Sequence, residues 1–442
     1  MNNGYPKAPL LEGLGEASKQ KNMTSKERFD LTVNHKQPDK VVVDFGSTAV
    51  TGIHVLSVEN LRKHYGLESR PVRVIEPYQM LGEVDSELVE AMGIDVIGAW
   101  GRNNMFGIYN HEPLKEMTTF WGQKVLVPNG FHTNFDEKGD LLIYPEGDLS
   151  AQASARMPKA SYFFDAIIRQ EPIDEEKIDV KDNLEEFGLV TEQELNFWKE
   201  ATRNARATGK AVIAGLGGTA LGDIALVPGI QMKHPKGIRD IAEWYMSTVM
   251  RPEYVTAIFD RQSEIALENF RRLHDVIGNN LDAVFICGTD FGTQDSTFCA
   301  PEQFDDLWLP YYRRINDWVH ANTSWKTFKH SCGAVETLMS RFVDAGFDII
   351  NPVQVSAKGM DPAHLKNTFG KDLVFWGGGI DTQKTLPYST SEQVREEVLR
   401  LCDIFAKDGG FVFNTVHNIQ ANVPVENIVA MVDAIKEFNG EK

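Results

Sequence analysis

Eight short apolar runs recur along this chain of 442 residues and constrain its fold more than any other feature. Their cores are continuous rather than alternating, as in VVVDF, AVIAGL and LVFW, which is typical of parallel strands covered on both faces. Most are followed by a helix-like segment, such as 334–345 or 391–406. This succession favours a (β/α)8 TIM barrel, with an open doubly wound sheet of eight strands as the alternative. The runs are Val41–Phe45, Asp95–Trp100, Ala211–Leu216, Ala283–Asp290, Lys326–Cys332, Asp348–Gln354, Leu373–Asp381 and Gly410–His417.

One spacing breaks this rhythm, because residues 101–210 separate the second run from the third. We expect this insertion to contain an antiparallel hairpin formed by Thr119–Gly122, Lys124–Val127 and, across an EKGD turn, Leu141–Tyr144. An acidic stretch with helical patterning, Glu171–Glu194, follows the hairpin. We interpret that stretch as a solvated helical face, with a partner-docking face as the alternative.

The start of the chain differs from the rest. Residues 1–22 are polar with scattered glycines and predict a flexible arm. Thr24 followed by Glu27 is a capping pattern, so a helix should begin here and run to about His35, before Gln37 and Pro38. Residues 23–442 are then expected to form one barrel domain that carries the long insertion.

Composition excludes several classes of protein. The chain has 45 Lys and Arg against 63 Asp and Glu, a net charge of −18, which argues against nucleic acid and anionic membranes as partners. No apolar run reaches the ~18 residues of a membrane helix, and no apolar leader precedes the first helix. Four scattered cysteines do not form a disulfide framework, and Cys287 and Cys402 are predicted core residues. We expect a cytoplasmic protein that acts on a small molecule.

Polar side chains follow the predicted strands, where a barrel places its active site. We expect them to gather at one mouth, as core strands do not usually end in polar groups. Asp290 is interpreted as a general base or a substrate anchor. For Asp290, as for Asp44 and Asp381, the alternative is that the carboxylate only caps the next turn. The candidates are Asp44, Arg102, Asn103, Asn104, Asp290, Gln294, Asn351, Gln354, Asp381, Gln383, His417 and Asn418.

The pair His330 and Cys332 carries the sharpest chemical signal. Residues i and i+2 of a strand point to the same side, so an imidazole and a thiol meet at one strand end. Zinc accepts this pair, although alone it is also compatible with a chance buried pair. His417 on the last run and Cys299 on the fourth loop are the plausible additional ligands. Three protein ligands with an open position are typical of a catalytic zinc site.

These motifs resemble the uroporphyrinogen decarboxylase superfamily, which includes cobalamin-linked methyltransferases. The likeness runs from about Met23 to Gly440, and it implies a (β/α)8 barrel. It rests on TSKERFDLTVNHKQPDKVVVDF, on GTDFGTQ at 288–294, HSCG at 330–333, NPVQ at 351–354, FWGGGID at 375–381 and VHNIQ at 416–420.

The resemblance is closest to the zinc-dependent methyltransferase branch. Uroporphyrinogen decarboxylases carry an arginine-rich motif that grips substrate carboxylates after the first strand, where this chain reads DFGST at 44–48. They also lack His-x-Cys on strand five, although they have a His where His417 stands. The zinc-dependent methyltransferases carry that His-x-Cys and add a Cys from strand eight. His330 and Cys332 match them, and His417 replaces the second Cys. This substitution lowers the ligand charge and should make a bound zinc a stronger Lewis acid.

The resemblance therefore implies a zinc-dependent methyltransferase that moves a methyl group between a corrinoid protein carrying methylcobalamin and a thiol or similar acceptor. Asp290, His417 and Asp381 would be catalytic, and the other strand-end residues would position substrate. One alternative is a metal-free decarboxylase (a carboxy-lyase) of a carboxylated tetrapyrrole or other ring acid, which would use Arg102 and Arg156 to hold carboxylates. A second is a non-catalytic corrinoid or tetrapyrrole binder. Fold analogy alone suggests a homodimer.

Overall fold

The computed structural model describes residues 23–441, so the predicted arm at 1–22 lies outside the described part. Its central sheet has eight strands in the order β1-β17-β16-β15-β14-β13-β12-β5, and all neighbours are parallel. A bridge between Asp44 and Val96 joins the two outer strands, which confirms the barrel over an open sheet. Each strand lies within one of the predicted runs: β1 (Val42–Val43), β5 (Val96–Gly98), β12 (Ala211–Ala214), β13 (Ala283–Cys287), β14 (Lys326–His330), β15 (Ile349–Asn351), β16 (Val374–Trp376) and β17 (Phe411–Phe413).

Apolar side chains cover both faces of these strands, which explains the continuous runs. One cluster takes residues from all eight strands and includes Ile213, Phe328 and Trp376. It fills the interior as packed layers of side chains do in TIM barrels. Helix α1 (Ser25–Thr32) closes one end, because its Phe29 packs edge-on against Trp376 with ring centroids 6.0 Å apart. A larger cluster lies between the strands and the surrounding helices.

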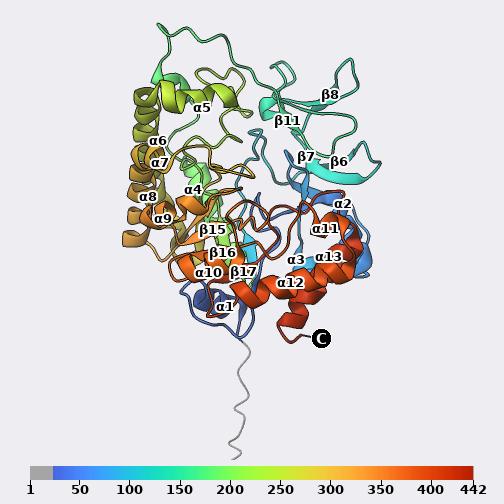
Figure 1. Cartoon of the computed structure of the whole chain (residues 1–442). Helices are drawn as coiled ribbons and strands as arrows, with labels where there is room; N and C mark the ends of the chain where they lie inside the picture. The colour runs from blue at the N-terminus through green and yellow to red at the C-terminus, as the bar shows by residue number, and fades with distance from the viewer. Residues whose placement is uncertain (1–22, 442) are drawn as a thin grey trace, which may run out of the picture.

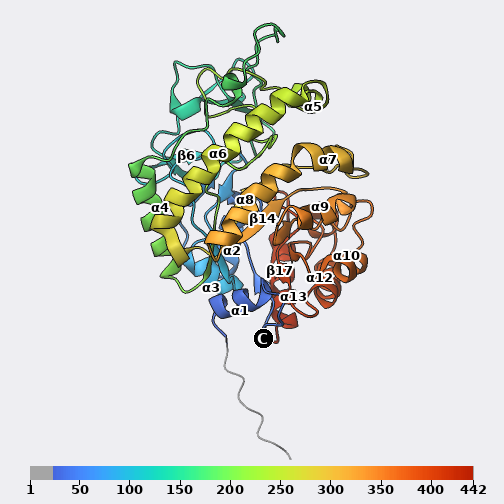
Figure 2. The ribbon, with the colours of Figure 1, turned by 90° about the vertical axis from the view of Figure 1, so that its left-hand side faces the viewer.

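The helices begin where local hydrogen bonding predicts. Thr24 and Glu27 form the expected capping box, although α1 ends at Thr32 rather than near His35. None of the described helices combines the length and the apolar character needed to cross a membrane. Helices α4, α6 and α8 lie side by side on one flank (Figure 2). The other helices are α2 (Val55–His64), α3 (Ser86–Met92), α4 (Glu192–Arg206), α5 (Ile241–Met250), α6 (Pro252–Ile277), α7 (Pro301–Leu307), α8 (Leu309–Asn322), α9 (Met339–Asp344), α10 (Pro362–Phe369), α11 (Thr385–Tyr388), α12 (Ser391–Phe405) and α13 (Val425–Phe438).

Two smaller sheets lie beyond the barrel, on the side opposite α1 (Figure 1). One has the order β2-β4-β3-β7-β6 and the other β11-β10-β9-β8. Strand β3 pairs in parallel with β7, so the connections after β1 and after β5 build one sheet together. Our sequence analysis placed no strands in the first of these connections. The strands are β2 (Ile53–His54), β3 (Val72–Glu76), β4 (Leu81–Gly82), β6 (Leu114–Thr118), β7 (Lys124–Pro128), β8 (Thr133–Phe135), β9 (Leu141–Ile143), β10 (Ala155–Met157) and β11 (Asp165–Ala166).

The segment between β5 and β12 differs from its prediction in two respects. Strand β7 forms its hairpin with β6, while β9 pairs with β8 across the EKGD turn, so the predicted pairing of strands was wrong. Residues 171–191 are irregular apart from the 3-10 turn Val180–Asn183, and helix α4 begins only at Glu192. The carboxylates of Asp174 and Asp179 accept bonds from backbone amides two residues onward. Such local bonds compete with a helix.

Candidate metal centre

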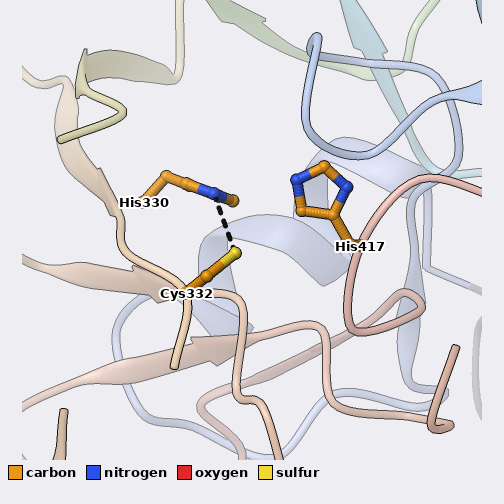
Figure 3. A group of neighbouring side chains, drawn as sticks. All are labelled: His330, Cys332 and His417. Carbon is orange, nitrogen blue, oxygen red and sulfur yellow. Dashed lines mark hydrogen bonds between the residues drawn. The ribbon is translucent and has the colours of Figure 1, made fainter. Parts of the chain in front are cut away.

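Three side chains predicted as metal ligands meet at the mouth of the barrel. His330 is the last residue of β14, Cys332 follows it by two positions, and His417 lies in the loop after β17. Their ligand atoms all lie within 4.8 Å of one another. Among the residues that the structure describes, these three form the group of side chains that could hold a metal ion. Figure 3 shows the three side chains converging from two separate segments. The pairing of β14, β15, β16 and β17 brings these segments to one end of the barrel.

The spacing of the cluster suits a tetrahedral metal. Cys332 Sγ lies 3.4 Å from His330 Nε2. Zinc–sulfur and zinc–nitrogen bonds at a tetrahedral angle place the two ligand atoms about 3.6 Å apart. The imidazole rings of His330 and His417 have centroids 5.5 Å apart and are nearly perpendicular. His330 is buried, whereas Cys332 and His417 are half-buried, so the cluster has an accessible side.

Asn351, at the end of β15, fixes the orientation of His330. The amide of Asn351 donates from Nδ2 to the Trp376 carbonyl at 2.9 Å, which leaves its Oδ1 facing His330 Nδ1 at 2.6 Å. Nδ1 must therefore carry the proton, and the lone pair of Nε2 faces Cys332. This kind of outer support is typical of metal-binding histidines. In the structure Asn351 has this positioning role, and its predicted binding of substrate stays a prediction.

The protonation states of the two histidines favour metal binding, whereas the thiol of Cys332 would have to lose its proton. Burial is the main cause that lowers the pKa of His330 to about 4. The hydrogen bond to Asn351 raises this pKa, and the cation of Lys329 lowers it. Burial and the neighbouring His330 lower the pKa of His417 to about 4. Both imidazoles are therefore neutral at neutral pH, as metal ligands must be. Burial raises the pKa of the Cys332 thiol well above its usual range, and the carboxylate of Asp290 raises it as well.

Two backbone contacts hold the Cys332 turn in place. The backbone N–H of Cys332 donates to Asp290 Oδ1 at 2.7 Å, and that of Gly333 donates to Gln354 Oε1 at 2.8 Å. Gly333 has a φ of +90°, and a Cβ there would lie 2.4 Å from the carbonyl carbon of Gly292. The chain can therefore turn here only with glycine. Asp290 Oδ1 also lies 3.8 Å from His330 Nε2, which places this carboxylate at the edge of the cluster.

Comparison with known proteins now identifies the family. The family described as Uroporphyrinogen decarboxylase (URO-D) matches residues 164–438, which is more than half of the chain. The chain belongs to the URO-D family. This confirms the resemblance that the strand-end motifs indicated.

Curated relatives of this URO-D family member align over limited regions. The uroporphyrinogen decarboxylase of Psychromonas ingrahamii is 38% identical over 80 residues, which cover 18% of this chain and 22% of the relative. That of Geobacter metallireducens is 25% identical over 213 residues, covering 47% of this chain and 56% of the relative. The chain thus matches less than two thirds of the length of either. Among solved structures, a methyltransferase from Methanosarcina mazei superposes with a TM-score of 0.52 over 94% of this chain and 99% of its own, at 14% identity. It shares the fold.

Several predicted site residues of this URO-D family member have hydrogen-bond partners within the protein. Asp44 is fully buried beneath the mouth and accepts from Trp376 Nε1 at 2.9 Å, and burial raises its pKa to about 6. Asn418 is buried and bonds Gly52 N, the Ala49 carbonyl and Gln79. Asp381 is buried and accepts from the backbone N–H of Gln383. These contacts support the loops around the mouth, and the roles of the three residues toward substrate stay predictions.

The remaining candidates lie at the surface or outside the cluster. Asn103 is exposed and accepts from the Arg102 guanidinium, and Gln294 and Gln383 are exposed as well. Cys299 is half-buried, its thiol has a pKa raised by burial to about 11, and it does not join the three ligands. The ligand role of Cys299 therefore stays a prediction.

Three residues near the cluster were missed by sequence reasoning. Lys329 is fully buried, donates to the carbonyls of Thr289 (2.6 Å) and His330, and lies 5.0 Å from the Phe291 ring centroid. Asp223 is buried, and its pKa is raised to about 6 by burial and by Asp290. Burial raises the pKa of Tyr245, on α5, and the nearby carboxylates of Asp290 and Asp223 raise it as well. Of the three, only Lys329 could have been found from the sequence, because it precedes His330 in a strand and so points to the opposite face.

Proposed function

We propose that this URO-D family protein is a methyltransferase that holds zinc at His330, Cys332 and His417. Its reaction would move a methyl group between a corrinoid protein carrying methylcobalamin and a thiol or similar acceptor. The observation that carries the proposal is the convergence of one thiol and two neutral imidazoles within 4.8 Å at the barrel mouth. The name of the Methanosarcina mazei fold neighbour, a methyltransferase, supports the reaction class.

The residues of this chain prepare the site for a thiol acceptor. A zinc ion bound there would supply Lewis acidity, which keeps a coordinated thiol deprotonated at neutral pH. Asn351 holds the lone pair of His330 toward the cluster. Asp290 fixes the backbone of Cys332 and keeps a carboxylate beside the accessible side. With only one thiolate among the protein ligands, the site carries less negative charge than a site with two.

A second function, carboxy-lyase activity, is supported by the names of the curated relatives. Removal of CO₂ from a ring acid requires cations that hold its carboxylates. Arg102 lies over the Tyr109 ring at 5.0 Å, and Arg156 lies 3.7 Å from the Asp140 carboxylate. Both candidates therefore have other partners in the segment between β5 and β12. The metal-ligand cluster favours methyl transfer over this alternative.

Metal analysis of the purified protein after reconstitution with zinc tests the proposal. We expect one zinc per chain in the wild type and none in Cys332→Ala. Cys402→Ala is the matched control, because Cys402 is a buried thiol on α12 and should leave zinc bound. The loaded wild type should also demethylate methylcobalamin in the presence of a thiol, followed by its absorbance.

Four outcomes would contradict the proposal. The first is a wild type that binds no zinc, and the second is a Cys332→Ala variant that retains it. The third is zinc-independent release of CO₂ from a carboxylated tetrapyrrole that depends on Arg102 or Arg156, which would establish the lyase. Tight binding of a corrinoid without turnover of any donor and thiol pair would instead favour a non-catalytic binder.

A further inference from the structure

The charges around the three ligands are few, and they indicate which acceptors the mouth can hold. Within the described part of the chain, the charged side chains that shift the pKa values of His330, Cys332 and His417 are Lys329 and Asp290. An acceptor with a carboxylate, sulfonate or phosphate near its sulfur needs a cation at this distance, most effectively an arginine. Lys329 is the cation among these groups, so it is the one of them that such an anion would have to reach.

Lys329 is not available to a ligand. Its side chain is fully buried in the layer between β14 and the helices. Its ammonium already donates to the carbonyls of Thr289 and His330 and lies 5.0 Å from the Phe291 ring centroid and 5.7 Å from that of Phe342. A ligand at the mouth would have to break these bonds to reach it.

Asp290, at the edge of the cluster, attracts hydrogen-bond donors, and Tyr245 near it offers a hydroxyl that can accept as well as donate. The side chain of Asp290 is 28% exposed, and its Oδ1 accepts from the Cys332 backbone, which leaves Oδ2 for a ligand. Tyr245 lies near Asp290 and Asp223, and its buried hydroxyl has no partner in the described structure. The Tyr245 ring is held by stacking on Phe298 with centroids 4.9 Å apart. An unpaired buried hydroxyl is costly, and a ligand that bonds it recovers that cost.

We propose that the acceptor carries a hydrogen-bond donor, an ammonium in the strongest case, close to its reacting sulfur, and that Asp290 and Tyr245 bind this group. Acceptors with an anionic group in the same place are rejected by the Asp290 carboxylate. This inference rests on the proposed zinc site, and it adds the charge class of the acceptor to that proposal. A mouth with this preference differs from a site that binds a polycarboxylate substrate, which needs cationic side chains.

Three thiols of the form HS–CH₂–CH₂–X test the inference: cysteamine with an ammonium, 2-mercaptoethanol with a hydroxyl and 3-mercaptopropionate with a carboxylate. Each is titrated into the cobalt(II)-substituted protein at pH 7.5, and Kd is measured from the thiolate-to-cobalt absorption band. Because the thiols differ in their own acidity, each Kd in Asp290→Asn is compared with the Kd of the same thiol in the wild type. Asp361→Asn removes an equal charge at the N-cap of α10 and serves as the control.

We expect Asp290→Asn to weaken cysteamine at least about tenfold and 2-mercaptoethanol about threefold, since bonds to a charged group are the stronger. Binding of 3-mercaptopropionate should become tighter in the same variant. Tyr245→Phe should weaken the first two thiols about threefold. The Asp361→Asn control should leave all three values unchanged.

Two results would overturn the inference in distinguishable ways. If all three thiols produce the absorption band but Asp290→Asn changes their Kd values by the same factor, Asp290 only shapes the metal site, and the charge preference is wrong while the zinc site stands. If the wild type takes up no cobalt, or no thiol gives the band, the proposed zinc site fails and this inference fails with it.

Discussion

Asn351→Ala tests whether the orientation of the His330 ring matters for metal binding, because the substitution removes the side chain that orients the ring and leaves His330 itself in place. Asn351 is fully buried and makes two bonds, one to His330 Nδ1 and one to the Trp376 carbonyl. Alanine leaves a donor and an acceptor unpaired, each costing about 1–3 kcal/mol, so the free energy of unfolding should fall by about 2–6 kcal/mol. The freed imidazole must then be reoriented on binding, which lowers metal affinity by about 10–100-fold.

Two measurements check this prediction. Zinc affinity is obtained by competition with a chromophoric chelator, and the free energy of unfolding of the metal-free protein is obtained by urea titration. Asn427→Ala is the matched control: Asn427 is a buried asparagine on α13 whose amide donates to the carbonyls of Leu386 and Ser389, both at 2.9 Å. It should lose similar stability and keep its zinc affinity.

The conservative variant Asn351→Asp adds a second check. An aspartate keeps an acceptor for His330 Nδ1 but loses the donor to the Trp376 carbonyl. It should therefore restore most of the zinc affinity while remaining less stable than the wild type. The reasoning is refuted if folded Asn351→Ala binds zinc within about twofold of the wild type, or if Asn427→Ala loses as much zinc affinity.

Two further predictions concern His417 and Gly333. In metal-free protein the folded pKa of His417 is about 4, below its ordinary 6.5, so the stability it contributes is present above pH 6.5 and is lost as the pH falls toward 4. Between pH 7.5 and 5 the wild type should lose about 2 kcal/mol more unfolding free energy than His417→Gln, and equal losses in urea titrations would contradict this. Gly333→Ala should cost about 3 kcal/mol or more, because its φ is +90° and its Cβ meets backbone. Gly139→Ala, at a φ of +82° with open space around it, should cost about 1 kcal/mol, and a similar loss in both variants would exclude the steric contribution.

The barrel was predictable because its signal is local and repeated. Each strand buries both faces, so each appears in the sequence as a continuous apolar run that needs no knowledge of its neighbours. The two outer sheets give no such signal. Strands β2 and β4 have two residues each, and β3 finds its parallel partner β7 some distance along the chain. Tertiary pairing of this kind decides strand identity where local preference is weak.

The candidate metal site was predictable for a related reason. His330 and Cys332 share one side of a strand end, and the order of barrel strands brings His417 to the same mouth. The roles of Asn351 and Asp290 depended on side-chain orientation, which the sequence does not specify. Cys299 lies outside the group of three, and the sequence could not place it because a long loop can hold a thiol in many positions.

The pairing of β2 with the loop after β17 has a consequence for how this protein can be altered. Ile53 forms a parallel bridge with Ile419, two residues beyond His417, and Gly52 N bonds the side chain of Asn418. The outer sheet therefore begins beside the short piece of backbone that orients His417, a candidate metal ligand. Trimming or exchanging that sheet would therefore also displace His417, so the outer sheet and the candidate metal site cannot be altered independently.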